Sequence, residues 1–465
     1  MLSGTAARTT LGASFRDPTG FMYREGGVLY RQVNSSSARH YGLLMNGGLY
    51  DALVGQSRLI PHQEVDGTSS SAYKTLRPDV IPYVSYPYEW CFSQLRDAAL
   101  LTLEIQLTSL SFGMTLKDAS AYNVQFIGHR PVFIDTLSFQ EYDEGSPWVA
   151  YRQFCQHFLG PLALMSHVDV RLRHLLRSFI DGIPLSLASR LLPARTRLRP
   201  GLLAHIHLHA ASQRQHQAPA RPHRRVRAPS LPKGRLIALI ENLRATVRGC
   251  SAPQEKTEWG DYYRETNYSP DAMEVKEALV RRMVDAVADP ADLIHDIGAN
   301  TGRFSRLLAG PGRYVVSHDI DELAVERHYV RNRSEGVEHV LPLLLDLTNP
   351  SPSIGWSLEE RTSAIERVSR GTVIALALVH HLAISNNVPL DGVAALFHRL
   401  ANTLIIEFVP KEDSQVQRLL ASREDVFPRY TFEEFLRVFS AMFEVREQHH
   451  VPGTSRTLFA MRRKD

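Results

Sequence analysis

The stretch LIHDIGANTGRFSRLL, residues 293–308, decides the fold of the C-terminal half of this chain. Its apolar start is typical of a buried strand, which ends in Asp296. A turn with Gly298, Asn300 and Gly302 follows, and a helix is expected directly after it. Glycine permits a positive-φ turn and the close approach of a ligand, and the start of a helix presents free amide groups. The segment therefore predicts a strand, a ligand-binding turn and a helix.

Short apolar runs separated by long connections recur through the C-terminal half. Such runs are typical of buried parallel strands joined by crossovers. Two later runs flank a Pro-Gly turn and predict an antiparallel hairpin that closes the sheet. The pattern predicts an α/β fold with a doubly wound parallel sheet. The five predicted parallel strands are residues 292–297, 314–317, 340–345, 373–379 and 404–409, and the hairpin strands are residues 443–447 and 457–461.

Acidic residues end three successive predicted strands. Asp296 ends the first, Asp319 in RYVVSHDID ends the second, and Asp346 closes LPLLLD at the end of the third. In doubly wound folds an acidic residue about 20 positions after the glycine turn accepts the hydroxyls of a ribose, and Asp319 fits that spacing. Asp321 lies two residues further on and is expected at the start of the next helix. The GxGxxG pattern of dinucleotide sites is incomplete, which argues against a dinucleotide.

The segment DIGANTG, with these acids, resembles motif I of the class I S-adenosylmethionine-dependent methyltransferases. The resemblance implies a Rossmann-like domain that binds S-adenosyl-L-methionine as its cofactor and transfers a methyl group to an acceptor. It also implies that Asp319 binds the ribose and that Asp346 receives the adenine amino group. The cofactor-binding residues that it implies are Asp296, Gly298, Asn300, Gly302, Asp319 and Asp346.

Four further segments resemble the rhizobial host-specific nodulation proteins and their methyltransferase-like relatives. The similarity covers most of the chain and weakens across residues 210–232. It implies a bacterial methyltransferase linked to nodulation, and it supplies no acceptor. The segments are FRDPTGFMYREGGVLYRQV, SYPYEW, LLLDLTNPSPSIGW and ALALVHHLAISNNVPL.

The fourth predicted strand runs TVIALALVHHL and is expected to end in His380 and His381. In the methyltransferases that the chain resembles, the residues after this strand face the transferring methyl group. A histidine here has a pKa suited to accepting a proton from the substrate, so both are candidate catalytic residues. The alternative is that one histidine packs beneath the cofactor, and the sequence favours neither.

Two further groups of residues have alternative interpretations. Aromatic residues before the first strand are either a lid over the cofactor or helix-packing residues. Glu407 and Lys411, near the end of the fifth strand, either bind substrate or pair with each other. The aromatic residues are Trp259, Tyr262, Tyr263 and Tyr268.

A second constellation lies in LKDASAYNVQFIGHRPVFIDTLSF, residues 116–139. Asp118 and Asn123 are spaced as in the kinase catalytic loop D-x4-N, and Asp135 follows a predicted hairpin as the metal-binding aspartate of kinases does. In a kinase-like domain Asp118 is the base, while Asn123 and Asp135 hold magnesium; otherwise no metal is expected. Leu116 and Lys117 replace the usual His-Arg pair, no glycine-rich loop is evident upstream, and Lys74 is only a guess for the phosphate-binding lysine. The alternative is a helix–loop–hairpin in a substrate-recognition domain.

Composition sets limits on the class of protein. The chain has 465 residues, 44% hydrophobic and 22% charged, which excludes a mainly disordered chain or a coiled coil. It has no run of about 18 apolar residues, so no membrane span is expected. The three cysteines lie far apart, which argues against a cysteine-based zinc site or a disulfide framework. The start of the chain lacks the apolar core of a secretory signal, and a cytoplasmic location is expected.

The stretch 201–230 is rich in arginine and histidine and contains no acidic residue. It is expected to be an interdomain linker, and nucleic-acid binding is disfavoured because few aromatic residues are interleaved with the charges. The predicted domains are an α+β domain over 1–200, a basic linker and helix over 201–255, and a methyltransferase domain over 256–465. Besides a methyltransferase, a non-catalytic cofactor-binding regulator and a bifunctional kinase-like methyltransferase fit the sequence. It indicates neither the acceptor nor the oligomeric state.

Overall fold

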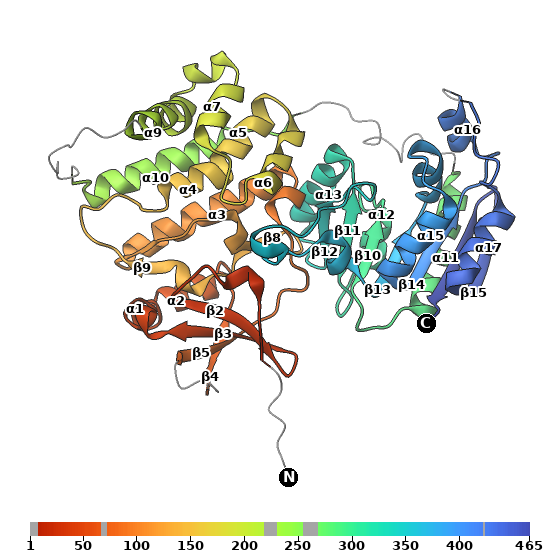
Figure 1. Cartoon of the computed structure of the whole chain (residues 1–465), viewed down its shortest axis with the longest axis horizontal. Helices are drawn as coiled ribbons and strands as arrows, with labels where there is room; N and C mark the ends of the chain where they lie inside the picture. The colour runs from red at the N-terminus through yellow and green to blue at the C-terminus, as the bar shows by residue number, and fades with distance from the viewer. Residues whose placement is uncertain (1–7, 67–71, 218–229, 254–267, 422–423) are drawn as a thin grey trace, which may run out of the picture. The chain divides into compact units, whose positions relative to one another are not determined.

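The computed structural model describes residues 8–66, 72–217, 230–253, 268–421 and 424–465. Contacts divide the chain into two compact units (Figure 1). The N-terminal unit comprises Met1–Phe126, Arg130–Gln254 and Ser353–Arg361, and the C-terminal unit comprises Ile127–His129, Glu255–Pro352 and Thr362–Asp465. Each unit therefore includes a short segment from the opposite half of the sequence.

The C-terminal unit is built on a seven-stranded sheet with the order β12-β11-β10-β13-β14-β16-β15. Strands β12, β11, β10, β13 and β14 are parallel, and β16 and β15 form an antiparallel hairpin at one edge. This confirms the predicted Rossmann-like sheet closed by a hairpin. The strands are β10 (Ile294–Ile297), β11 (Val315–Asp319), β12 (Val340–Leu344), β13 (Gly371–Ala375), β14 (Ala401–Phe408), β15 (Phe443–His450) and β16 (Thr457–Arg463). The helices are α11 (Pro270–Val287), α12 (Arg303–Leu308), α13 (Glu322–Glu335), α14 (Ala364–Val368), α15 (Leu390–Leu400), α16 (Ser414–Leu420) and α17 (Phe432–Met442).

The sheet of the C-terminal unit is buried on both faces. Alternate residues of a strand point to opposite faces, and neighbours along β14 belong to different apolar clusters. Leu404 and Ile406 pack in the cluster that includes α15 and α17, whereas Ile405 packs in the cluster that includes α11. In α15 the buried residues recur at helical spacing, so one stripe of that helix covers the sheet. The continuous apolar runs in the sequence are thus explained by two apolar faces on each strand.

The fourth parallel strand ends earlier than predicted. Strand β13 stops at Ala375, whereas the sequence predicted a strand that continues to the two histidines. Ala377 adopts φ 48°, and its N–H donates to the side-chain carboxylate of Glu407 at 2.8 Å rather than to the backbone of β14. The chain therefore turns away from the sheet before His380, which precedes the π-helical turn His381–Ser385.

The N-terminal unit begins with an antiparallel sheet of order β1-β2-β3-β5-β4, followed by a long buried helix and a helical region. The long buried helix is α3, and the predicted hairpin before Asp135 is confirmed as β7 and β8. The strands are β1 (Thr9–Thr10), β2 (Gly20–Glu25), β3 (Val28–Asn34), β4 (His62–Val65), β5 (Ala72–Pro78), β6 (Met114–Leu116), β7 (Val124–Ile127), β8 (Arg130–Phe133) and β9 (Phe139–Glu141). The helices are α1 (Ala38–Asn46), α2 (Leu49–Gly55), α3 (Phe92–Ser111), α4 (Tyr151–Phe154), α5 (Gly160–His167), α6 (Leu175–Ser178), α7 (Leu185–Leu191), α8 (Pro200–Leu202), α9 (His209–Gln217) and α10 (Lys233–Arg248).

The first part of the basic stretch is not a linker. Residues 201–217 are helical, and the side chains of His205 and His207 are buried. His205 bonds to Tyr151 and Asn242, and His207 bonds to a serine and a threonine hydroxyl. Burial lowers the pKa of both imidazoles, so they are neutral near pH 7 and pack as polar core residues. The sequence predicted a solvated linker because histidine is a polar residue, but His205 and His207 are buried.

The segment Ser353–Arg361, which follows β12 in sequence, packs within the N-terminal unit. Arg16 bonds to the Glu360 carboxylate at 2.7 Å, and the Arg361 guanidinium lies 4.1 Å from the centre of the Tyr122 ring.

No helix in the described part of the chain is long and apolar enough to span a bilayer.

Candidate functional site

The turn after β10 has the backbone that its glycines predict. Gly298, Asn300 and Gly302 all have positive φ, at 80°, 50° and 75°. A Cβ on Gly302 would lie 1.9 Å from the ring of His328 on α13, so only glycine fits there. A Cβ on Gly298 would meet Leu378 at 3.4 Å, so the positive φ, more than crowding, favours glycine at that position. Contacts with the rest of the C-terminal unit thus hold the turn in its shape.

Asp319 ties this turn to the end of β11. Its Oδ2 accepts a hydrogen bond from the Asn300 N–H at 2.7 Å, and its Oδ1 accepts one from the Asp321 N–H at 2.8 Å. The side chain is 9% exposed, and burial raises its pKa to about 6. Each carboxylate oxygen keeps further lone pairs, so additional donors such as ribose hydroxyls would stabilise the ionised form.

Asp296 turns toward the helix that follows the turn. Its Oδ2 accepts a hydrogen bond from the Ser305 hydroxyl on α12 at 2.6 Å. Burial raises the pKa of Asp296 to about 6, and the neighbouring Asp319 charge adds to that shift. This contact joins the end of β10 to α12, so Asp296 orders the turn between them.

The two remaining acids, Asp346 and Asp321, accept hydrogen bonds from the backbone that follows them. Asp346 follows β12 by two residues, and its Oδ1 accepts hydrogen bonds from the Thr348 N–H at 2.8 Å and the Thr348 hydroxyl at 2.6 Å. Asp321 is the N-cap of α13, because its carboxylate accepts from the N–H groups of Leu323 and Ala324. The predicted position of Asp321 at the start of a helix is confirmed.

The predicted cofactor residues meet at one edge of the sheet. The Gly298 turn, Asp319 and Asp346 follow β10, β11 and β12, which are adjacent and parallel. Strand β10 also pairs with β13, so the crossovers leave the sheet in opposite directions on the two sides of β10. Ligands of open α/β sheets bind outside the carboxyl ends of the strands at such a switch point. The geometry supports a nucleotide-like ligand at this edge.

His380 and His381 lie beyond the early end of β13. Their rings are 4.1 Å apart, and the side chain of His380 is buried. Burial lowers the pKa of His381 to about 4 and that of His380 well below its usual value. Both imidazoles are therefore neutral and weakly basic near pH 7, which favours the packing alternative over proton removal.

A buried charged network in the C-terminal unit was not predicted. Lys276 on α11 bonds to Glu407 on β14 at 2.7 Å, and both side chains are at most 3% exposed. The Tyr268 hydroxyl donates to the same carboxylate, and Arg456 reaches that hydroxyl at 3.2 Å and Asp413 at 2.8 Å. Lys276 and Arg456 lie far from Glu407 in sequence, so nothing local signals these contacts.

The network corrects two interpretations. Glu407 does not pair with Lys411, whose ammonium bonds to Asp425 at 2.7 Å. Tyr268 packs in the apolar core and bonds to Glu407, so its role is in packing. The other aromatic residues of the predicted lid, Trp259, Tyr262 and Tyr263, lie outside the described residues.

The second constellation is brought together in the N-terminal unit. Asn123 donates to the Ser138 hydroxyl at 3.2 Å, and that hydroxyl donates to Asp135 at 2.5 Å. Asp118 lies close enough to Asp135 for the two charges to interact, and burial raises the pKa of Asp118. Among the described residues, no group of three or more His, Cys, Asp or Glu side chains is placed to hold a metal; this constellation has two carboxylates and an amide.

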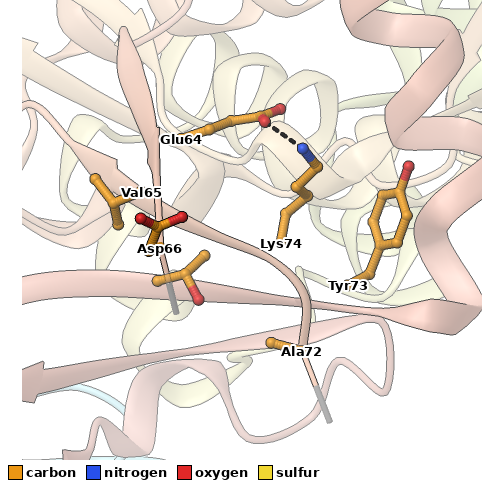
Figure 2. A pocket seen from close by; sticks show the side chains of 7 residues that line it. Glu64, Val65, Asp66, Ala72, Tyr73 and Lys74 are labelled. Atoms are coloured by element: carbon orange, nitrogen blue, oxygen red, sulfur yellow. Dashed lines mark hydrogen bonds and ion pairs between the residues drawn. The ribbon is translucent and has the colours of Figure 1, made fainter. Parts of the chain in front are cut away.

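Lys74, the residue considered for phosphate binding in a kinase-like domain, bonds to a residue outside the second constellation. Figure 2 shows Lys74 on β5 bonded to Glu64 on β4 at 2.5 Å, in a hollow at the ends of these strands. Asp66 and Ala72, which line the hollow, flank residues 67–71, and no other predicted site residue lines it. The structure thus gives no support to a phosphate-binding role for Lys74. The basic residue that contacts Asp135 is Arg31, at 2.5 Å, which the sequence analysis missed.

Comparison with known proteins gives one relative along nearly the whole chain. The chain is 35% identical over 460 residues to "Nodulation protein NoeA" of Rhizobium meliloti (strain 1021), covering 97% of this chain and 96% of that protein. No protein-family model matches the sequence.

Solved structures match about two-fifths of the chain. Magnesium protoporphyrin IX methyltransferase (ChlM) from Synechocystis PCC 6803 with bound SAH is 18% identical, with 42% of this chain and 84% of that chain covered and a TM-score of 0.30. N-methyltransferase NodS from Bradyrhizobium japonicum WM9 with S-adenosyl-L-homocysteine is 13% identical, with 43% and 90% covered and a TM-score of 0.30. Similarity at this level does not extend to function.

Proposed function

We propose that this chain, which belongs to the family of the nodulation protein NoeA, is an S-adenosyl-L-methionine-dependent methyltransferase. The observation that carries the proposal is the buried Asp319 carboxylate, bonded to the turn at Asn300, at the switch point of a Rossmann-like sheet. The family relation supports a role in nodulation, with an acceptor still to be identified. The proposed cofactor domain is residues 256–465.

The hydrogen-bond acceptors at the carboxyl ends of β11 and β12 fit this cofactor. Asp319 offers two carboxylate oxygens for ribose hydroxyls, and Asp346 offers an acceptor for the adenine amino group. Gly298 and Gly302 allow the positive-φ turn that precedes α12. When bound, S-adenosyl-L-methionine supplies a methyl group activated by a sulfonium. The chain's own part is to position the ligand and the acceptor and to exclude water.

Binding of the cofactor is the direct test. We expect S-adenosyl-L-methionine and S-adenosyl-L-homocysteine each to bind the full chain and raise its melting temperature. A ligand at about 100 times its dissociation constant stabilises a fold by about 2.7 kcal/mol. Isothermal titration calorimetry measures the affinity. A folded sample that gives no heat with either compound contradicts the proposal.

The raised pKa of Asp319 predicts how cofactor binding depends on pH. Ribose hydroxyls donate to the ionised carboxylate, so binding is expected to strengthen as the pH rises through about 6 and to level off above it. Below that pH the carboxyl must lose a proton before it accepts both hydroxyls. Calorimetry at about pH 5 and about pH 7.5 measures the difference. Asp319→Asn, which cannot ionise, should flatten the profile; an equal slope in this variant would assign the dependence to another group.

A non-catalytic cofactor-binding regulator is the second candidate. The low pKa values of His380 and His381 favour it, because they leave these residues poor bases. Methyl transfer from labelled cofactor to an extract separates the candidates: a labelled product supports the enzyme, and binding without any labelled product supports the regulator.

A further inference from the structure

The N-terminal unit has the order of elements in which protein kinases build their phosphate site. A small antiparallel sheet comes first, then helix α3, the loop that holds Asp118 and Asn123, and the hairpin β7–β8 before Asp135. In kinases the basic residue that meets the phosphates lies on the third strand of the small sheet. Strand β3 carries Arg31 here, and Arg31 contacts Asp135 at 2.5 Å. The fold thus brings a basic residue to the loop from a segment about 90 residues earlier in sequence.

The loop residues are arranged around Asp135. The Asn123 carbonyl accepts from the Ile134 N–H at 2.8 Å, which holds the loop against the strand that leads to Asp135. The Asn123 side chain reaches Asp135 through the Ser138 hydroxyl, at 3.2 Å and 2.5 Å. The Asp118 carboxylate accepts from the Ser120 N–H at 2.9 Å and is also bonded to Asn123. Two carboxylates and an amide are therefore held by one network, and oxygen ligands of this kind suit Mg²⁺.

Arg31 keeps capacity for a further anionic partner. Its side chain is 11% exposed, and its Nε is buried with no hydrogen-bond partner among the described residues. Its guanidinium contacts Asp135 and lies 3.9 Å from Asp17, on the segment that precedes β2. A partly buried arginine with an unpaired N–H is suited to a phosphate, because guanidinium donors match phosphate oxygens.

We propose that the N-terminal unit binds a nucleoside triphosphate with a divalent cation, with Asp135 and Asn123 holding the cation and Arg31 meeting the phosphates. Asp118 occupies the place of the kinase base. The site is separate from the proposed cofactor site, and neither proposal depends on the other. The test therefore uses both ligands on one sample.

Calorimetry on the full chain, with ATP as the probe, tests this proposal. We expect ATP with Mg²⁺ to bind and to raise the melting temperature, and ATP with a chelator to bind at least about tenfold more weakly. Binding of S-adenosyl-L-homocysteine to the same sample reports on the other site. Absence of ATP binding with Mg²⁺ at millimolar concentration, on protein that is folded by circular dichroism, overturns the proposal and favours a substrate-recognition domain.

Matched variants assign the residues. Arg31→Met should weaken Mg-ATP binding roughly 10- to 100-fold, whereas Lys74→Met removes a cation from the same sheet and should leave it unchanged. Asp135→Asn should remove the dependence on Mg²⁺, and Asp143→Asn, at an exposed carboxylate bonded to Ser146, should not. If Asp135→Asn does not fold, Asn123→Ala replaces it. Equal affinity in Arg31→Met and Lys74→Met, or an unchanged Mg²⁺ dependence in the loop variants, overturns the assignment.

Discussion

Replacing Lys276 by methionine is expected to lower the free energy of unfolding by about 3–5 kcal/mol, because the change leaves Glu407 buried without its partner. The pair is 2.7 Å apart, and the Glu407 side chain is 0% exposed. Burial alone raises the pKa of Glu407, but the charges of Lys276 and Arg456 outweigh it and hold the pKa below its usual value. The carboxylate is therefore ionised in the folded protein. The substitution removes the Lys276 ammonium, which is one of the two positive charges that keep Glu407 ionised. Chemical denaturation followed by circular dichroism measures the loss.

The same substitution at a surface lysine is the control. Lys411 bonds to Asp425 at 2.7 Å, but the Asp425 side chain is 44% exposed, so Lys411→Met should cost less than about 1 kcal/mol. A double variant, Lys276→Met with Glu407→Leu, should recover much of the stability, because no charge is then left buried alone. If Lys276→Met and Lys411→Met lower the free energy of unfolding equally, the buried pair contributes no more to stability than a surface pair does.

The C-terminal fold was predictable because its signal is local. Each parallel strand is buried on both faces, so it appears in the sequence as a short apolar run, and the glycine turn appears as DIGANTG. The strand ends were less predictable. The run after Gly371 stays apolar past Ala375, but Ala377 bonds to Glu407 and the strand stops. A contact between residues 30 positions apart thus decided where the strand ends.

The residues that could not be identified from the sequence have one thing in common: their partners are brought to them only when the chain folds. Arg31 reaches Asp135 across about 100 residues, and Lys276 reaches Glu407 across 131. Similarly, His205 and His207 are typical linker residues by composition and become core residues because hydroxyl and amide partners satisfy them. Polar residues are assigned to the surface by pattern alone, so buried polar networks are the features that pattern misses.

Asp319→Ala is expected to weaken S-adenosyl-L-methionine binding by about 1.5–3 kcal/mol, roughly 10- to 150-fold, because it removes the acceptor proposed for the ribose hydroxyls. The structure adds a cost that the strand-end position did not suggest. The N–H groups of Asn300 and Asp321 lose their carboxylate acceptor, so the fold should also lose about 1–3 kcal/mol of stability. Affinity must therefore be measured by calorimetry on folded protein rather than inferred from a melting temperature.

Asp321→Ala separates the two effects. Asp321 caps α13 through two backbone N–H groups, so its loss should cost about 1 kcal/mol of stability and leave cofactor affinity nearly unchanged. The two neighbouring acids are thus expected to differ in affinity: Asp319→Ala loses both affinity and stability, whereas Asp321→Ala loses stability alone. If Asp321→Ala abolishes binding while Asp319→Ala binds normally, the ribose contact belongs to Asp321. If neither variant changes affinity, the edge of the sheet at β10 and β11 is not the cofactor site, and the proposed methyltransferase function loses its principal support.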